Sequence, residues 1–318
     1  MKRIGILRGG VGDEYYFSLE SGARVIEAFR DSGCEVIDML IDKDGILHIK
    51  GIPSDLNSIK NHVDIVWNTV HGHFGEDGSL QAMLDGIDMP YVGSGQLASA
   101  ISYNKLSAKG RAEALGMKTP QVMMISPQRF DSVTEVTQSI YHRMAPPWVI
   151  KPLRGGASVR TYFAFTPLEL SQFVEESISH SEPFIVEQYI YGREAVVGVI
   201  DDFRGQKQYT LPVVEIDSPR NGILTHDMRK SNGHANHETK LRPEEKDQLA
   251  EYARKLHTDI GAEDFSQSDF IVDNHGKIWY LETDTIPHMG HHNAFVKGLK
   301  SVGSSISEFV KSVIGRKK

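Results

Sequence analysis

Residues 269–284 have the sequence DFIVDNHGKIWYLETD, in which two β-prone runs flank a short polar stretch. This pattern predicts a β-hairpin with its turn around Gly276. If the loop is centred just before Gly276, Asp269 lies opposite Glu282. Because side chains alternate along a strand, Asp284 then lies on the same face as Glu282. The hairpin is therefore expected to gather three carboxylates on one face.

Two interpretations of this carboxylate face remain open from the hairpin alone. Three carboxylates repel one another unless a cation holds them. Oxygen ligands without cysteine favour Mg²⁺ or Mn²⁺, which also binds phosphate oxygens. The alternative is a solvated polar face with no ligand.

Upstream of the hairpin, Lys151 follows an apolar run and precedes the glycine pair Gly155-Gly156. A lysine at a strand end beside a glycine loop suits phosphate binding, because glycine lets backbone N–H groups approach the oxygens. Taken by itself, Lys151 is better explained as a surface lysine before a turn.

The N-terminal segment alternates strand, glycine turn, helix and strand, a pattern typical of an open α/β sheet. The predicted strands are residues 3–7, 35–41 and 63–70, and the predicted helix is 18–31 with Ser18 as its cap. The loop 9–14 and the loop 71–78 follow strands, so both are expected at the binding crevice of the sheet. The first loop lacks the third glycine of a dinucleotide fingerprint, and its Glu14 has the alternative role of a helix-start acid.

Histidines cluster at two places in the chain. Residues 71–78, HGHFGEDG, combine two histidines and two acids, which fits a metal site, an acid–base pair or simply the start of a helix at residue 77 or 78. His288, His291 and His292 lack the His-Glu-x-x-His spacing of a zinc site. We expect the second cluster to orient or contact substrate.

Downstream, helices are expected at 104–115, 167–180 and 243–261, and strands at 148–152, 183–189 and 195–200. The polar connection 217–241 is long enough to be functional or mobile. The predicted domains are 1–101, 102–182 and 183–318.

Length and composition narrow the class of protein. A chain of 318 residues exceeds one ordinary domain. Its net charge of −7 argues against a nucleic-acid partner, and the absence of a long apolar run argues against a transmembrane helix. The single cysteine excludes an intrachain disulfide, and no signal-peptide core precedes the first glycines. We expect a cytoplasmic protein with no membrane partner.

Seven motifs in order resemble the D-alanine–D-alanine ligase family of ATP-grasp enzymes. They span most of the chain and lie at residues 9–22, 71–78, 90–95, 151–152, 186–194, 211–216 and 282–287. The resemblance implies an α/β, three-domain ATP-grasp fold with an N-terminal open parallel-sheet (preATP-grasp) domain. ATP would lie between the second and third domains. Because the family is often dimeric, a homodimer is one expectation for this chain.

Residue roles follow from the same resemblance. Nucleotide-binding positions are Lys109, Lys151, Glu187, Tyr189, Ile190, Glu194 and Lys230; two Mg²⁺ (or Mn²⁺) ions would be held by Asp269, Glu282 and Asp284. Catalytic positions are Glu14, Ser158, Gln267 and His288, and substrate-binding positions are Glu14, His71, His288, His292 and Asn293. The implied reaction phosphorylates the carboxylate of one D-alanine and lets a second amine attack the acyl phosphate, for peptidoglycan precursors.

Several positions depart from the family pattern. Gln267 replaces an arginine, His288 replaces a glycine and Asp284 replaces an asparagine, while Arg160 and Ser231 stand in place of a glycine and a tyrosine. His288, His292 and Arg160 are candidates to supply the missing positive charge. These departures leave the second substrate open among D-alanine, D-lactate, D-serine and another nucleophile. A nucleotide-binding paralogue without ligase activity is the other alternative.

Overall fold

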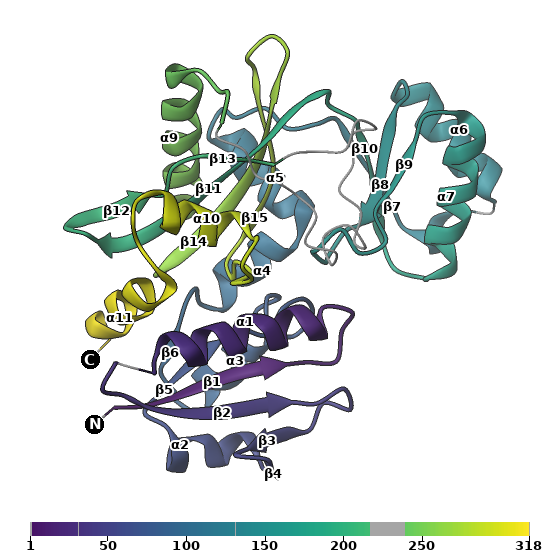
Figure 1. Ribbon diagram of the computed structural model, residues 1–318. Helices are drawn as coiled ribbons and strands as arrows, with labels where there is room; N and C mark the ends of the chain where they lie inside the picture. The colour runs from purple at the N-terminus through teal and green to yellow at the C-terminus, as the bar shows by residue number, and fades with distance from the viewer. Residues whose placement is uncertain (1, 31, 131, 217–238, 318) are drawn as a thin grey trace.

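The computed structural model describes residues 2–30, 32–130, 132–216 and 239–317. Three sheets follow one another along the chain, each with helices packed on it (Figure 1). In this described part, no helix is long and apolar enough to cross a membrane.

The N-terminal sheet has the strand order β4-β3-β2-β1-β5-β6. Strands β2, β1, β5 and β6 pair in parallel, which confirms the predicted open parallel sheet, and β3 and β4 add an antiparallel edge. The elements are β1 (Arg3–Gly9), α1 (Tyr15–Ala28), β2 (Glu35–Ile41), β3 (Leu47–Ile49), β4 (Ile52–Pro53), a 3₁₀ turn (Leu56–Ser58), α2 (Ile59–His62), β5 (Ile65–Asn68), α3 (Ser79–Gly86) and β6 (Tyr91–Val92).

Helix α1 begins earlier than predicted, because Glu14 and not Ser18 is its N-cap. Ser18 lies buried inside the helix, where its hydroxyl accepts a hydrogen bond from the Gly9 N–H at 2.7 Å and donates one to the Thr69 carbonyl at 2.8 Å. The hydroxyl thus ties α1 to the ends of β1 and β5. This shift brings Glu14 to the carboxyl edge of the sheet.

The central sheet is antiparallel, with the order β7-β10-β8-β9, and α6 and α7 lie side by side against it (Figure 1). Its elements, with the two helices that lead into it, are α4 (Gln96–Tyr103), α5 (Lys105–Ala114), β7 (Val122–Ile125), a 3₁₀ turn (Pro127–Arg129), α6 (Val133–Arg143), β8 (Trp148–Pro152), β9 (Tyr162–Ala164), α7 (Pro167–Ser179) and β10 (Phe184–Gln188). Strand β10 pairs with β7 and β8, so the predicted domain boundary at 182/183 cuts through this sheet. The sheets divide after β10.

The C-terminal sheet has the order β12-β11-β14-β15, and β13 also pairs with β11. All of its pairs are antiparallel. Its elements are β11 (Gly192–Phe203), β12 (Gln206–Thr210), β13 (Val214–Ile216), α9 (Pro243–Asp259), β14 (Phe265–Asp273), β15 (Ile278–Asp284), α10 (Ala294–Ser301) and α11 (Ile306–Arg316).

The hairpin formed by β14 and β15 has the predicted pairing of Asp269 with Glu282, but this pairing depends on a register shift that was not predicted. The turn is one position tighter than predicted, since Asp273 and Lys277 pair across a three-residue loop with Gly276 at a φ of 77°. A register shift next to Asp269 then restores the expected alignment.

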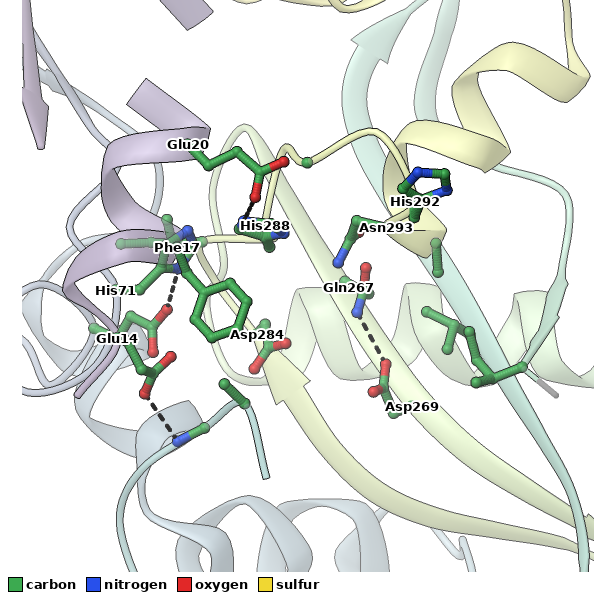
Figure 2. Close-up of a pocket in the computed structure, with 18 of the residues that line it drawn as sticks. Glu14, Phe17, Glu20, His71, Gln267, Asp269, Asp284, His288, His292 and Asn293 are labelled. Atoms are coloured by element: carbon green, nitrogen blue, oxygen red, sulfur yellow. Dashed lines mark hydrogen bonds and ion pairs between the residues drawn. The ribbon is translucent and has the colours of Figure 1, made fainter. Parts of the chain in front are cut away.

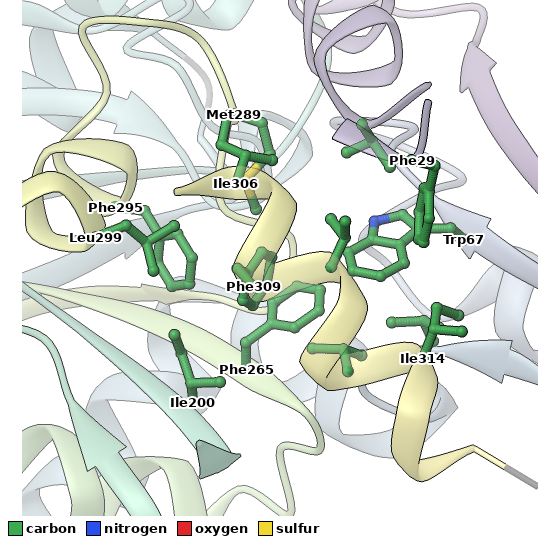
Figure 3. Packing of buried hydrophobic residues seen from close by; sticks show 14 of the residues in the cluster. Phe29, Trp67, Ile200, Phe265, Met289, Phe295, Leu299, Ile306, Phe309 and Ile314 are labelled. Atoms are coloured by element: carbon green, nitrogen blue, oxygen red, sulfur yellow. The ribbon is translucent and has the colours of Figure 1, made fainter. Parts of the chain in front are cut away.

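An aromatic core joins the N-terminal and C-terminal units (Figure 3). Trp67 from β5 stacks on Phe265 from β14 at 5.9 Å between ring centroids, and Phe309 from α11 meets both rings edge-on. This packing fixes the end of the parallel sheet against the C-terminal sheet, and therefore the geometry of any site between them.

Replacing Phe309 with alanine tests how much this aromatic core contributes to the stability of the protein. Phe309 is 0 % exposed, so the substitution leaves a cavity and should lower the free energy of unfolding by about 3–5 kcal/mol. Urea unfolding of wild type and variant measures the difference. The matched control is Leu168→Ala, since Leu168 is 80 % exposed and its loss should change stability by less than about 0.5 kcal/mol. A small loss for Phe309→Ala would show that the two units are held together elsewhere.

Candidate active site

Two adjoining cavities lie where the three sheets meet. The larger has a volume of about 470 Å³ and the smaller about 130 Å³, and Gly156, Glu194 and Asp269 line both. The start of α1, the first half of β14, the end of β15 and the loop before α10 surround the larger cavity (Figure 2). The smaller lies against β8, β10 and the loop after Lys151.

Glu14 projects into the larger cavity from the N-cap position of α1. It is buried, and the Gly156 N–H donates a hydrogen bond to its Oε1 at 3.3 Å. Burial and, to a smaller extent, the neighbouring Glu76 together raise the pKa of Glu14 to about 7, against the opposing effects of His71 and Lys105. Glu14 can therefore change its charge near neutral pH.

Both ring nitrogens of His71 lie within hydrogen-bond distance of a neighbouring side chain. Its Nε2 lies 2.9 Å from the Ser21 hydroxyl and its Nδ1 lies 2.9 Å from Glu76 Oε1. Burial lowers the pKa of His71 to about 4 and raises the pKa of Glu76 to about 8. A neutral imidazole and a protonated carboxyl thus share a hydrogen bond, and His71 is a fixed wall of the cavity.

The three histidines of the loop before α10 point to different partners. His288 Nε2 lies 3.4 Å from Glu20 Oε2, whereas His291 Nε2 lies 2.6 Å from an Arg24 nitrogen. His292 lines the larger cavity. Burial lowers the pKa of His288, with Glu20 opposing the shift, so its neutral form is favoured at neutral pH.

Asn293 ends this loop as the N-cap of α10. Its Oδ1 accepts a hydrogen bond from the Phe295 N–H at 2.9 Å. The side chain also lines the larger cavity, close to His292.

The hairpin places its carboxylates along the boundary of the two cavities. Asp269 lines both, Asp284 lines the larger and Glu282 lines the smaller. Burial raises the pKa of Asp284 well above its usual value, and the charges of Glu282, Glu76 and Glu14 add to the rise. Gln267 lies opposite Asp284, and its Nε2 donates a hydrogen bond to Asp269 Oδ1 at 3.1 Å.

This donor set fits Mg²⁺ or Mn²⁺ that is bound together with phosphate. Within the described ranges, no three His, Cys, Asp or Glu side chains converge closely enough to form a metal cage of their own. Mg²⁺ seldom needs one, because it commonly takes one or two carboxylates plus the oxygens of a bound phosphate and water. The crowding that raises the pKa of Asp284 is the kind that a cation relieves.

A buried ion-pair triad lies beside the smaller cavity. Glu187 receives Lys109 Nζ at 3.0 Å on one oxygen and Lys151 Nζ at 2.9 Å on the other. Despite burial, the two lysines lower the pKa of Glu187 to about 2. The triad carries one net positive charge, and Lys151 lines the cavity.

Sequence reasoning missed Lys105. This lysine is the first residue of α5, where it donates to the Gly155 carbonyl and lies 3.8 Å from Glu282 Oε2. The available signal was its spacing of four residues from Lys109, which puts both on one helix face after the Asn104 cap. Glu76 and Glu20 were likewise not among the predicted site residues, although both line the larger cavity.

The remaining predicted residues divide into three groups. Ser158, Tyr189, Ile190 and Glu194 line the smaller cavity. Arg160 does not approach Gln267, because it pairs with Glu182 at 3.1 Å and lines a different cavity. Lys230 and Ser231 lie outside the described residues.

Comparisons with known proteins agree with this architecture. A family model described as D-ala D-ala ligase C-terminus matches residues 112–315, and one described as D-ala D-ala ligase N-terminus matches residues 50–94. A D-alanine–D-alanine ligase from Aquifex aeolicus is 31% identical over 98% of this chain and 99% of its own length. One from Halalkalibacterium halodurans is 30% identical, with 98% of each chain covered.

Solved structures show the same fold. A D-Ala:D-Ser ligase from Enterococcus faecalis has a TM-score of 0.82 at 24% identity, covering 99% of this chain and 98% of that one. A D-alanine–D-alanine ligase from Bacillus anthracis complexed with ATP has a TM-score of 0.79 at 21% identity, covering 99% and 97%. The fold is thus that of the ATP-grasp ligases, as the sequence predicted. With its family models and whole-length relatives, this chain belongs to the D-alanine–D-alanine ligase family of carboxylate–amine ligases.

Proposed function

We propose that the protein is an ATP- and Mg²⁺-dependent ligase that forms D-alanyl-D-alanine for peptidoglycan precursors. The observation that carries this proposal is the meeting of the two cavities at Asp269 and Gly156. One cavity contains lysines suited to phosphate and the other an acidic group suited to an amino-acid ammonium. Two reactants bound there would meet at the carboxylates of the hairpin.

The smaller cavity is proposed as the nucleotide site. Lys151, Lys105 and the triad partner Lys109 supply positive charge toward the phosphates. Tyr189 and Ile190 offer apolar surface for the adenine, and Glu194, shared by both cavities, is placed to accept from a ribose hydroxyl. Ser158 lies on the phosphate-facing loop, whose φ values of 49° at Ala157 and 55° at Ser158 mark a tight, strained turn.

The first D-alanine is proposed to bind at Glu14. Its ammonium would pair with the Glu14 carboxylate, and the neutral His71 would form the wall beside it. The second D-alanine would lie against Gln267, His288, His292 and Asn293 on the opposite side of the same cavity.

The chemistry requires two displacements. The carboxylate of the first D-alanine takes the γ-phosphoryl group from ATP, and ADP leaves. The amine of the second D-alanine then attacks the acyl carbon, loses a proton and expels phosphate. Lys151 and Lys105 would neutralise the transferring phosphoryl group.

Asp269, Glu282 and Asp284 would hold the divalent cations, which when bound neutralise phosphate charge. The same proposal includes three domains with ATP between the second and third, a cytoplasmic location and a homodimer.

Mass spectrometry of the products tests the activity. The protein is incubated with ATP, Mg²⁺ and D-alanine, alone or with D-serine or D-lactate as second substrate. The expected products are ADP, phosphate and D-alanyl-D-alanine. ATP binding without any condensed product would favour the non-catalytic paralogue, and a depsipeptide from D-lactate would redefine the second substrate.

The pKa of Glu14 gives a pH prediction. The substrate amine stays protonated below pH 7, but Glu14, with a pKa raised to about 7, loses its charge there. The KM for the first D-alanine should therefore rise as pH falls below 7, by roughly tenfold for each unit. Glu14→Gln should raise KM and flatten this profile, whereas Glu251→Gln, at an exposed ion pair on α9, should not alter it. A flat wild-type profile would mean that Glu14 does not bind the ammonium.

Lys151→Ala tests the nucleotide site. A lost charge-assisted contact of about 1.5–3 kcal/mol corresponds to a KM for ATP that is roughly tenfold to a hundredfold higher. The matched control is Lys60→Ala, at a half-exposed lysine of the N-terminal unit. Steady-state kinetics at saturating D-alanine measures both. An unchanged KM and kcat for Lys151→Ala would remove Lys151 from the phosphate site.

A further inference from the structure

The larger cavity is rich in hydrogen-bond acceptors. The ionisable side chains that the described part of the chain contributes to its lining, histidines aside, are all acidic: Glu14, Glu20, Glu76, Glu194, Asp269 and Asp284. Such a lining attracts positive charge and hydrogen-bond donors. The proposed first substrate and the cations use several of these groups, but not all of the acceptors.

Among the residues that the structure describes, one acceptor in the wall of this cavity has no hydrogen-bond partner. Gln267 is only 6 % exposed, and its Oε1 is a buried atom without a hydrogen bond. The orientation of the amide follows from Asp269, which as a carboxylate can only accept, so Nε2 must face it. Figure 2 shows Oε1 directed away from Asp269, toward the side of the cavity where Asn293 and His292 lie.

A buried carbonyl oxygen without a donor is costly, so a bound ligand that donates to it gains affinity. We propose that the second-substrate site also accepts D-amino acids whose side chain ends in an ammonium group, and that this group donates to Oε1 of Gln267. This inference rests on the proposed function and adds a substrate class to it. It makes Gln267 a specificity-determining residue.

The surroundings of Gln267 favour an ammonium over a neutral donor. Glu20, which is partly exposed at the rim, and Glu194 place negative charge around the same space, apart from the hairpin carboxylates assigned to the cations. The pKa of His71 is lowered to about 4 and that of His288 is lowered as well, so these two histidines add little opposing charge at neutral pH.

A pair of matched substrates isolates the terminal ammonium. D-ornithine and D-norvaline have the same carbon chain and differ only in the side-chain amine. Each is offered as second substrate with D-alanine as first, and kcat/KM is measured together with Kd by calorimetry in the presence of Mg²⁺ and a non-hydrolysable ATP analogue. D-ornithine should exceed D-norvaline by roughly tenfold or more in both quantities. Equal values would overturn the inference.

The contribution of Gln267 is tested by Gln267→Leu, which keeps the approximate size and removes the acceptor. The ratio between D-ornithine and D-norvaline should fall toward one, and Gln267→Glu should keep it or raise it. Gln128→Leu, the same change at an exposed position, should leave the ratio unchanged. A ratio that survives in Gln267→Leu would overturn the role of this residue. An equal loss for both substrates would do the same, because Oε1 would then serve only the reacting amine.

The two readouts separate this inference from the proposed function. A binding preference for D-ornithine without any condensed product supports the specificity and contradicts the ligase activity. Ligation of D-alanine, with D-norvaline bound as well as D-ornithine, supports the activity and contradicts the specificity.

Discussion

The burial of like charges is the constraint on which this structure depends. Glu14, Glu76 and Asp284 are acids removed from water within one region, and the pKa of each is raised by burial and by neighbouring carboxylates. Beside them, Lys109 and Lys151 share the single carboxylate of Glu187. Neither arrangement is stable in isolation, because a buried charge without a counter-charge costs several kcal/mol. Acidic and basic groups therefore face each other across a narrow boundary, where a phosphate and a cation would complete the charge balance.

The fold supplies this boundary from elements distant in sequence. The Ser18 hydroxyl fixes α1 to the sheet, so Glu14 lies at its edge. The aromatic contacts of Trp67, Phe265 and Phe309 hold the N-terminal sheet against the C-terminal sheet. The register shift next to Asp269 then aligns the hairpin carboxylates with both cavities.

Local patterns in the sequence were sufficient to predict part of this arrangement. Alternation and a glycine turn predicted the pairing of Asp269 with Glu282, and the order of motifs predicted the fold and the family. The sequence could not show that β10 pairs within the central sheet, because pairing partners depend on tertiary contacts. Lys105 was missed since its importance arises from Gly155 and Glu282, which lie far along the chain. Arg160 was a candidate to supply the positive charge that Gln267 lacks, but it pairs with Glu182 and lines a different cavity.

The central claim is that the hairpin carboxylates form a cation site that is completed by nucleotide. The most direct measurement is a titration of Mn²⁺ into the protein with a non-hydrolysable ATP analogue, with free Mn²⁺ followed by electron paramagnetic resonance. Wild type should take up Mn²⁺, and Glu282→Gln should bind it at least roughly tenfold more weakly. Glu251→Gln, at an exposed ion pair on α9, is the unaffected control. Equal uptake by wild type and Glu282→Gln, or no uptake beyond that of the free analogue, would contradict the account.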